Sequence, residues 1–176
     1  MKRYGLLMLL TMVSAASHAE TRLGYWDITL KGKVLASSCD LDSSSAQQTV
    51  HLGSFASTAF KNVGDTTTDA PLDITLTNCG ENIVGAKITF SGTQDADNPQ
   101  LLALTDTGSG SALASGVAVE LMDKSRAVIP INSTTAQYPL GAGNNTLNFL
   151  LHYKATRIPV SGGNGTAVMY FDVSYQ

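Results

Sequence analysis

Apolar and polar residues alternate with a period of about two in a series of short runs, and no long segment carries a helical stripe. Turn-forming Gly, Asn, Asp and Ser residues separate these runs. The pattern predicts strands at 28–30, 49–52, 72–76, 86–90, 117–121, 147–153 and 167–176. Many short strands with this punctuation favour an all-β, immunoglobulin-like β-sandwich in one domain.

The last predicted strand, residues 167–176, alternates like a half-buried strand. One face carries Ala167, Met169, Phe171, Val173 and Tyr175, and the other carries Asp172 and Ser174. Segments at chain ends are usually loose and polar. An apolar face at this position therefore needs a packing partner, in the same molecule or in another one.

Residues 1–19 have the pattern of a secretory signal peptide. Met1–Arg3 is basic, residues 5–16 are apolar or small, and Ser17–Ala19 has the small–x–small form of a cleavage site. The apolar run is shorter than the roughly 20 residues that span a bilayer. We expect this segment to be removed on export, leaving no membrane anchor.

Charge argues against nucleic-acid binding. Removing Lys2 and Arg3 leaves 9 basic residues against 14 acidic ones, and no basic cluster remains.

The two cysteines, Cys39 and Cys79, are expected to form a disulfide, because an exported protein meets an oxidising compartment. Closing a loop of about 40 residues stabilises a fold by roughly 3–4 kcal/mol on the chain-entropy model. A metal site would need further cysteines or closely spaced histidines, whereas His51 and His152 stand alone.

Ahead of Cys39, residues 20–36 contain a further alternating run. Trp26, Ile28, Leu30 and Gly32 share one face, and Asp27, Thr29, Lys31 and Lys33 share the other. A sandwich could use this run as an ordinary first strand, and the pattern alone leaves that reading open.

Catalytic motifs are absent from the sequence. There is no G-x-S-x-G elbow, no H-E-x-x-H and no phosphate-binding glycine loop, and His51 and His152 are expected to be ordinary strand residues. The acidic run at 95–106 lacks the Gly and Glu that a calcium loop requires. We therefore expect neither enzymatic activity nor a metal or cofactor.

Several motifs in order along the chain resemble the subunits of chaperone–usher fimbriae, most closely the minor or adaptor subunits of type 1 fimbriae. They are "DITLKGKVLASSC" at 27–39, "LTNCG" around Cys79, "LNFLLHYKATRIPVSGG" at 147–163 and the closing "VSYQ". Tyr175 is the penultimate residue and Gly163 the fourteenth from the end, as in the family's C-terminal signature.

The resemblance implies an incomplete sandwich that lacks its C-terminal strand, with residues 34–176 as the pilin domain and 20–33 as an N-terminal donor-strand extension. It implies an acceptor groove and C-terminal motif at Gly163, Met169, Phe171, Val173 and Tyr175. A periplasmic chaperone would cover this groove first. At the outer-membrane usher, the donor strand of a neighbouring subunit, carrying Trp26, Ile28, Leu30 and Gly32, would replace it.

The expected function is thus a structural subunit of an adhesive fimbria on the bacterial surface. The alternative is a glycan-binding fimbrial adhesin module. Such adhesins carry an additional lectin domain and lack a donor strand, and the 157 residues after position 19 match a pilin domain alone.

Overall fold

The computed structural model describes residues 38–108 and 110–176. They belong to a compact unit formed by residues 34–176. The expected signal peptide at 1–19, the expected donor strand at 20–33 and the strand predicted at 28–30 lie outside the described residues. The predicted sandwich can therefore be compared with the structure from Ser38 onward.

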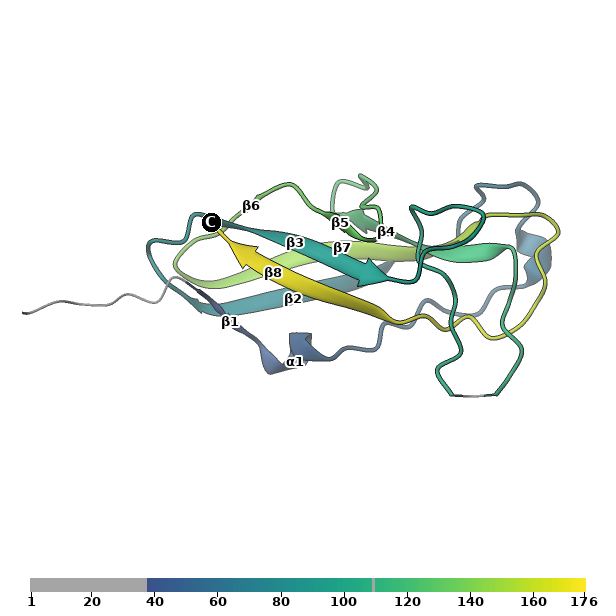
Figure 1. The fold of residues 1–176 in the computed structure, drawn as a ribbon, viewed down its shortest axis with the longest axis horizontal. Coiled ribbons are helices and arrows are strands. Elements are labelled where there is room, and N and C mark those ends of the chain that lie inside the picture. Colours follow the sequence, from purple (N-terminus) through teal and green to yellow (C-terminus); the bar gives the residue numbers. More distant parts are fainter. Residues whose placement is uncertain (1–37, 109) are drawn as a thin grey trace, which may run out of the picture. The chain divides into compact units, whose positions relative to one another are not determined.

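Within the described residues, eight strands form two antiparallel sheets. The first sheet has the order β1 (Asp40–Leu41), β2 (Ala70–Cys79), β7 (Gly143–Ala155) and β4 (Val117–Asp123). In the second sheet β3 (Gly85–Gly92) pairs with β5 (Ser133–Thr134), β6 (Tyr138–Pro139) and β8 (Met169–Tyr175). A short helix, α1 (Ser43–Ala46), and a 3-10 turn, η1 (Ser57–Ala59), lie between β1 and β2. Figure 1 shows β8 running beside β3.

The two sheets pack face to face through the side chains that alternation directs inward. Every second residue of β2 from Ala70 to Leu76 is buried. The rings of Phe90 on β3 and Phe149 on β7 are fully buried and meet edge to face, with centroids 5.0 Å apart. The core is therefore shared between the sheets, as in a β-sandwich.

The predicted disulfide is present and lies at the edge of the first sheet. It joins Cys39, just ahead of β1, to Cys79 at the end of β2. After β1 the chain turns into α1, which begins where the carboxylate of Asp42 accepts a hydrogen bond from the backbone N–H of Ser44 at 2.9 Å. The disulfide thus ties the residue ahead of β1 to the last residue of β2.

The sandwich and five of its strands confirm the sequence prediction: β2, β3, β4, β7 and β8 coincide with predicted runs. The strand predicted at 49–52 is wrong, because these residues are extended but pair with no strand among the described residues. The strand predicted at 147–153 is longer than expected, since β7 runs from Gly143 to Ala155.

Candidate functional site

β8 is the edge strand of the second sheet. It pairs with β3 from Gly92 to Ala86 and, within the part of the chain that the structure describes, with no strand on its other side. An unpaired strand edge exposes backbone N–H and C=O groups that can bind a further strand. This makes the free side of β8 the first candidate for a site.

The hydrogen bonds of β3 show which backbone groups of β8 are free. The carbonyl oxygens of Ile88 and Phe90 accept hydrogen bonds at 2.8 and 2.7 Å from amides in residues 132–135, which lie on the side away from β8. In an antiparallel ladder, residues opposite such positions also direct their N–H and C=O groups outward. Val173, opposite Ile88, and Phe171, opposite Phe90, therefore present these groups at the free edge.

The side chains of the same residues face the core but are incompletely covered. Met169, Phe171, Val173 and Tyr175 are all half-buried and pack against the core cluster. The β3 partners of Tyr175, Val173 and Phe171 are fully buried: Ala86, Ile88 and Phe90 are 0% exposed. The apolar face of β8 therefore lacks a neighbour on one side.

The segment after α1 lies beside the first sheet and packs against the same core. Val50 and Leu52 are half-buried against the core, whereas His51 between them is exposed. The side chain of Gln48 donates a hydrogen bond to the carbonyl oxygen of Asp73 on β2 at 2.8 Å, which holds the segment beside the first sheet. Among the described residues, no backbone–backbone hydrogen bond involves residues 47–55. Within the described part of the chain this segment, like the free side of β8, is therefore unpaired.

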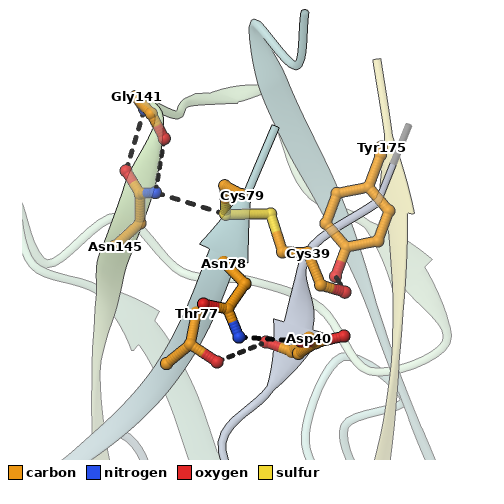
Figure 2. The surroundings of a disulfide bond; sticks show 8 residues. All are labelled: Cys39, Asp40, Thr77, Asn78, Cys79, Gly141, Asn145 and Tyr175. Atoms are coloured by element: carbon orange, nitrogen blue, oxygen red, sulfur yellow. Dashed lines mark hydrogen bonds between the residues drawn. A yellow bond between two sulfur atoms is a disulfide. The ribbon is translucent and has the colours of Figure 1, made fainter. Parts of the chain in front are cut away.

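Tyr175 joins the two sides at the disulfide. Its hydroxyl donates a hydrogen bond to the carbonyl oxygen of Cys39 at 3.2 Å, and Figure 2 shows the ring lying between β8 and this cysteine. The contact shows that the free edge of β8 and the β1 edge of the first sheet lie on the same side of the sandwich. Burial raises the pKa of the Tyr175 phenol, so the hydroxyl stays a donor at neutral pH.

We call this region the β8 edge strip. It consists of the half-buried apolar side chains of β8 and of the segment after α1 that pack against the core cluster: Val50, Leu52, Met169, Phe171, Val173 and Tyr175. It combines apolar side chains with unpaired backbone groups over the length of one strand. An added strand could cover the apolar side chains and form hydrogen bonds with the backbone groups.

The expected site residues divide into three groups. Met169, Phe171, Val173 and Tyr175 lie in the strip, and Trp26, Ile28, Leu30 and Gly32 fall outside the described residues. Gly163 lies in the loop before β8, where a Cβ atom would stand 2.4 Å from the carbonyl carbon of Leu113 and 2.5 Å from the nitrogen of Ala114. The absence of a Cβ at Gly163 thus allows the loop before β8 to approach residues 113–114 closely.

Val50 and Leu52 were not assigned to the site from the sequence. Their alternation with Thr49 and His51 was visible, but it was interpreted as an ordinary strand. What distinguishes these residues from an ordinary strand is that no strand among the described residues pairs with them, and only the structure shows this.

Other kinds of site find no support in the described residues. They contain no group of three or more His, Cys, Asp or Glu side chains placed to hold a metal ion. No helix in the described part of the chain is long and apolar enough to cross a membrane.

Comparison with known proteins gives consistent results. Residues 28–176 match the family model described as "Fimbrial protein". The chain is 43% identical over 146 residues to the fimbrial-like protein YcbU of Escherichia coli strain K12, covering 82% of this chain and 81% of that one. It is 33% identical over 152 residues to the fimbrial subunit type 1 of Salmonella typhimurium, covering 85% and 82%. The crystal structure of the type I fimbria protein BPSL1626 of Burkholderia pseudomallei superposes with a TM-score of 0.61 at 34% identity, covering 78% of this chain and 89% of that one.

Proposed function

Because this chain belongs to the fimbrial protein family, we propose that it polymerises by donor-strand exchange, with residues 26–32 of the next subunit added to the β8 edge strip of the subunit before it. The chain is a structural subunit of a fimbria, exported through the periplasm to the cell surface. Such subunits polymerise with other pilin subunits. The donor, the acceptor and their order of assembly are the new elements of the proposal.

The observation that carries the proposal is the half-burial of the β8 side chains beside an unpaired edge. Phe171 and Val173 face the core, yet they remain only half-covered. Their backbone groups point toward the same open side. A strand laid there supplies ladder hydrogen bonds and covers the apolar side chains at once.

The proposed donor has the matching periodicity. Trp26, Ile28 and Leu30 lie on one face of residues 26–32, as a strand facing the core requires. Burying two aliphatic side chains and one Trp would contribute roughly 5–10 kcal/mol before ordering costs. Gly32 on the same face would allow close approach of the two backbones.

A strip of this kind is an aggregation hazard until it is covered. We therefore propose that a periplasmic chaperone covers the β8 edge strip first, by adding a strand to the edge of β8. The outer-membrane usher is the proposed place where the donor strand of the next subunit replaces it. Both partners are what the resemblance to chaperone–usher fimbriae implies, and a chaperone strand would keep Phe171 and Val173 covered during export.

Within the fibre we propose a minor or adaptor position, as the resemblance to type 1 minor subunits implies. Gold-labelled antibody against this chain should then mark fimbriae sparsely or at their tips. Labelling along the whole shaft would assign the chain to the rod and contradict this part of the proposal, while leaving donor-strand exchange intact.

Donor-strand complementation tests the central step. Residues 20–33 are deleted and appended after residue 176 through a short flexible linker, and thermal unfolding is compared with the deletion alone. A matched control carries Ile28→Asp and Leu30→Asp in the appended strand. We expect a soluble monomer whose melting temperature rises by many degrees only with the intact strand. A deletion variant that is already monomeric and equally stable would overturn the proposal.

A further inference from the structure

A row of charged side chains crosses the outer face of the first sheet, away from the β8 edge strip. Glu120 on β4 lies directly opposite His152 on β7. Asp69 immediately precedes β2, whose first residue, Ala70, pairs with Leu151. The row Asp69–His152–Glu120 therefore spans three neighbouring segments of the sheet.

Both ring nitrogens of His152 meet carboxylate oxygens. Nδ1 lies 2.9 Å from Oδ1 of Asp69, and Nε2 lies 2.8 Å from Oε2 of Glu120. The side chains of His152 and Glu120 are each 6% exposed, and that of Asp69 is 13% exposed. The imidazole is thus enclosed between two acceptors with little access to water.

The remaining carboxylate oxygens have cationic partners of their own. Nζ of Lys154 lies 2.7 Å from Oε1 of Glu120, and the guanidinium of Arg126 lies 2.5 Å from Oδ2 of Asp69. Each carboxylate thus has one oxygen beside the imidazole and the other beside a cation. The charged groups that face His152 are therefore two carboxylates, each also bound to a basic side chain.

A neutral imidazole does not satisfy this arrangement. It has one N–H donor and one lone pair, whereas an ionised carboxylate only accepts hydrogen bonds. One ring nitrogen would then direct its lone pair at an oxygen lone pair in a buried site, which is costly. We propose that His152 is held as a doubly protonated imidazolium ion that donates to Asp69 and Glu120 and ties β4, β7 and the start of β2 together.

The arrangement links folding to a proton. An unfolded chain releases the second imidazole proton near pH 6.5, whereas the folded ring retains it between the carboxylates. Above that pH folding takes up a proton, so this tie stabilises the domain fully in mild acid and weakens as rising pH removes the proton from the folded state. The inference rests on the outer face of the first sheet and is independent of donor-strand exchange.

Nuclear magnetic resonance of the full chain labelled with ¹⁵N-histidine tests the proposal. At about pH 7.5, where a free histidine is mostly neutral, both ring nitrogens of His152 should give the matched shifts of an imidazolium ion. His51 is exposed and serves as the internal control. His152→Gln and His51→Gln identify the signals of these two residues among those of the three histidines of the full chain. A widely split pair of ¹⁵N shifts for His152, the signature of a neutral tautomer, would overturn the proposal.

A second variant distinguishes a charged His152 from a neutral His152 that merely packs in the same place. In Glu120→Gln the amide can donate to Nε2, so a neutral ring bonded to Asp69 through Nδ1–H becomes satisfied. We expect the His152 signals to change to the neutral pattern at about pH 7.5 while the domain stays folded. In parallel, the melting temperature of the unsubstituted chain should fall from about pH 6 to about pH 8.5 by several degrees more than that of His152→Gln. Equal pH dependence in the two chains would contradict the proton linkage.

Discussion

The ring of Phe171 lies 6.5 Å from the ring of Phe90, directly across the β8–β3 pair. The two residues are opposite each other in register, yet Phe90 is fully buried and Phe171 only half-buried. The difference arises because β3 has strands on both sides, whereas β8 has a neighbour on one side only among the described residues. The partial exposure of Phe171 thus results from the lack of a second neighbour for β8 among the described residues.

Replacing Phe171 by Ala should weaken strand addition and the completed fold. In the donor-strand-complemented chain this ring would be fully covered, so its truncation should lower the free energy of unfolding by about 3 kcal/mol. Tyr170→Ala is the matched control, because Tyr170 is 68% exposed on the opposite face of β8 and should cost within about 0.5 kcal/mol. Urea unfolding measures both. Equal losses in the two variants would argue against a covered strip at Phe171.

Replacing Gly163 by Ala should destabilise the domain through a clash between two loops. The new Cβ would stand 2.4 Å from the backbone of Leu113, so the two loops must separate, at a cost of about 1–3 kcal/mol. At Gly162 nothing lies within 4 Å of an added Cβ, and Gly162→Ala should change stability by less than about 0.5 kcal/mol. Urea unfolding of both variants checks the difference. If they behave alike, the close approach at Leu113 is not what requires a glycine.

The disulfide should be a major source of stability. Cys39 and Cys79 are separated by 40 residues, and constraining a loop of this length stabilises by roughly 3–4 kcal/mol. The double variant Cys39→Ser, Cys79→Ser should lose that amount in urea unfolding and become insensitive to added dithiothreitol. The unsubstituted chain should lose about as much stability when reduced as through the substitutions. A reduced chain as stable as the oxidised one would contradict this account.

Periodicity predicted the sandwich because a half-buried strand imposes a period of two on its own sequence. β2, β3, β4, β7 and β8 were all found in this way. Alternation reports which side chains face inward, but not whether a neighbouring strand is present. For that reason residues 49–52 were predicted to be a paired strand, whereas the structure leaves them unpaired.

The half of the site on β8 was predictable for the same reason, since Phe171 and Val173 alternate with polar residues. The role of Gly163 was not, because its contact with Leu113 joins segments 50 residues apart. His152 is a strand residue as predicted, but its ion pairs depend on the register of three strands at once. A single sequence carries no signal for that register.

The turn after β4 should weaken in acid through Asp123. Its carboxylate accepts hydrogen bonds from the side chain of Ser125 at 2.6 Å and from the backbone N–H groups of Ser125 and Ala127. These bonds, led by that from the Ser125 hydroxyl, lower the pKa of Asp123 below its usual value of 3.8. The group therefore stabilises the fold above that value, and the contribution is lost as pH falls through the lowered pKa.

Asp123→Asn tests this contribution. The variant should melt below the unsubstituted chain near neutral pH, and the gap should narrow as the pH falls below about 4. Differential scanning calorimetry over this range measures the gap. Ser125→Ala, which removes the leading hydrogen bond, should reproduce part of the loss. A gap that stays constant with pH would show that Asp123 acts without its charge.

Gly32 should decide whether the proposed donor strand can enter. It shares a face with Ile28 and Leu30, so a side chain there would point into the core beside β8 and keep the two backbones apart. Synthetic peptides of residues 20–33 can be offered to the chain lacking that segment, with binding followed by the rise in melting temperature. We expect Gly32→Leu to weaken peptide binding at least about tenfold, or about 1.4 kcal/mol.

Lys31→Leu is the matched control for this peptide, because it adds the same side chain to the polar face, where it should remain outside the core. Its binding should equal that of the natural peptide or exceed it slightly through added apolar area. If both substituted peptides bind as the natural one does, steric exclusion at Gly32 is wrong, although an incomplete sheet could still accept a strand. If only the Lys31→Leu peptide fails, the donor enters with its opposite face inward, and Asp27, Thr29 and Lys31 would be the residues that meet β8.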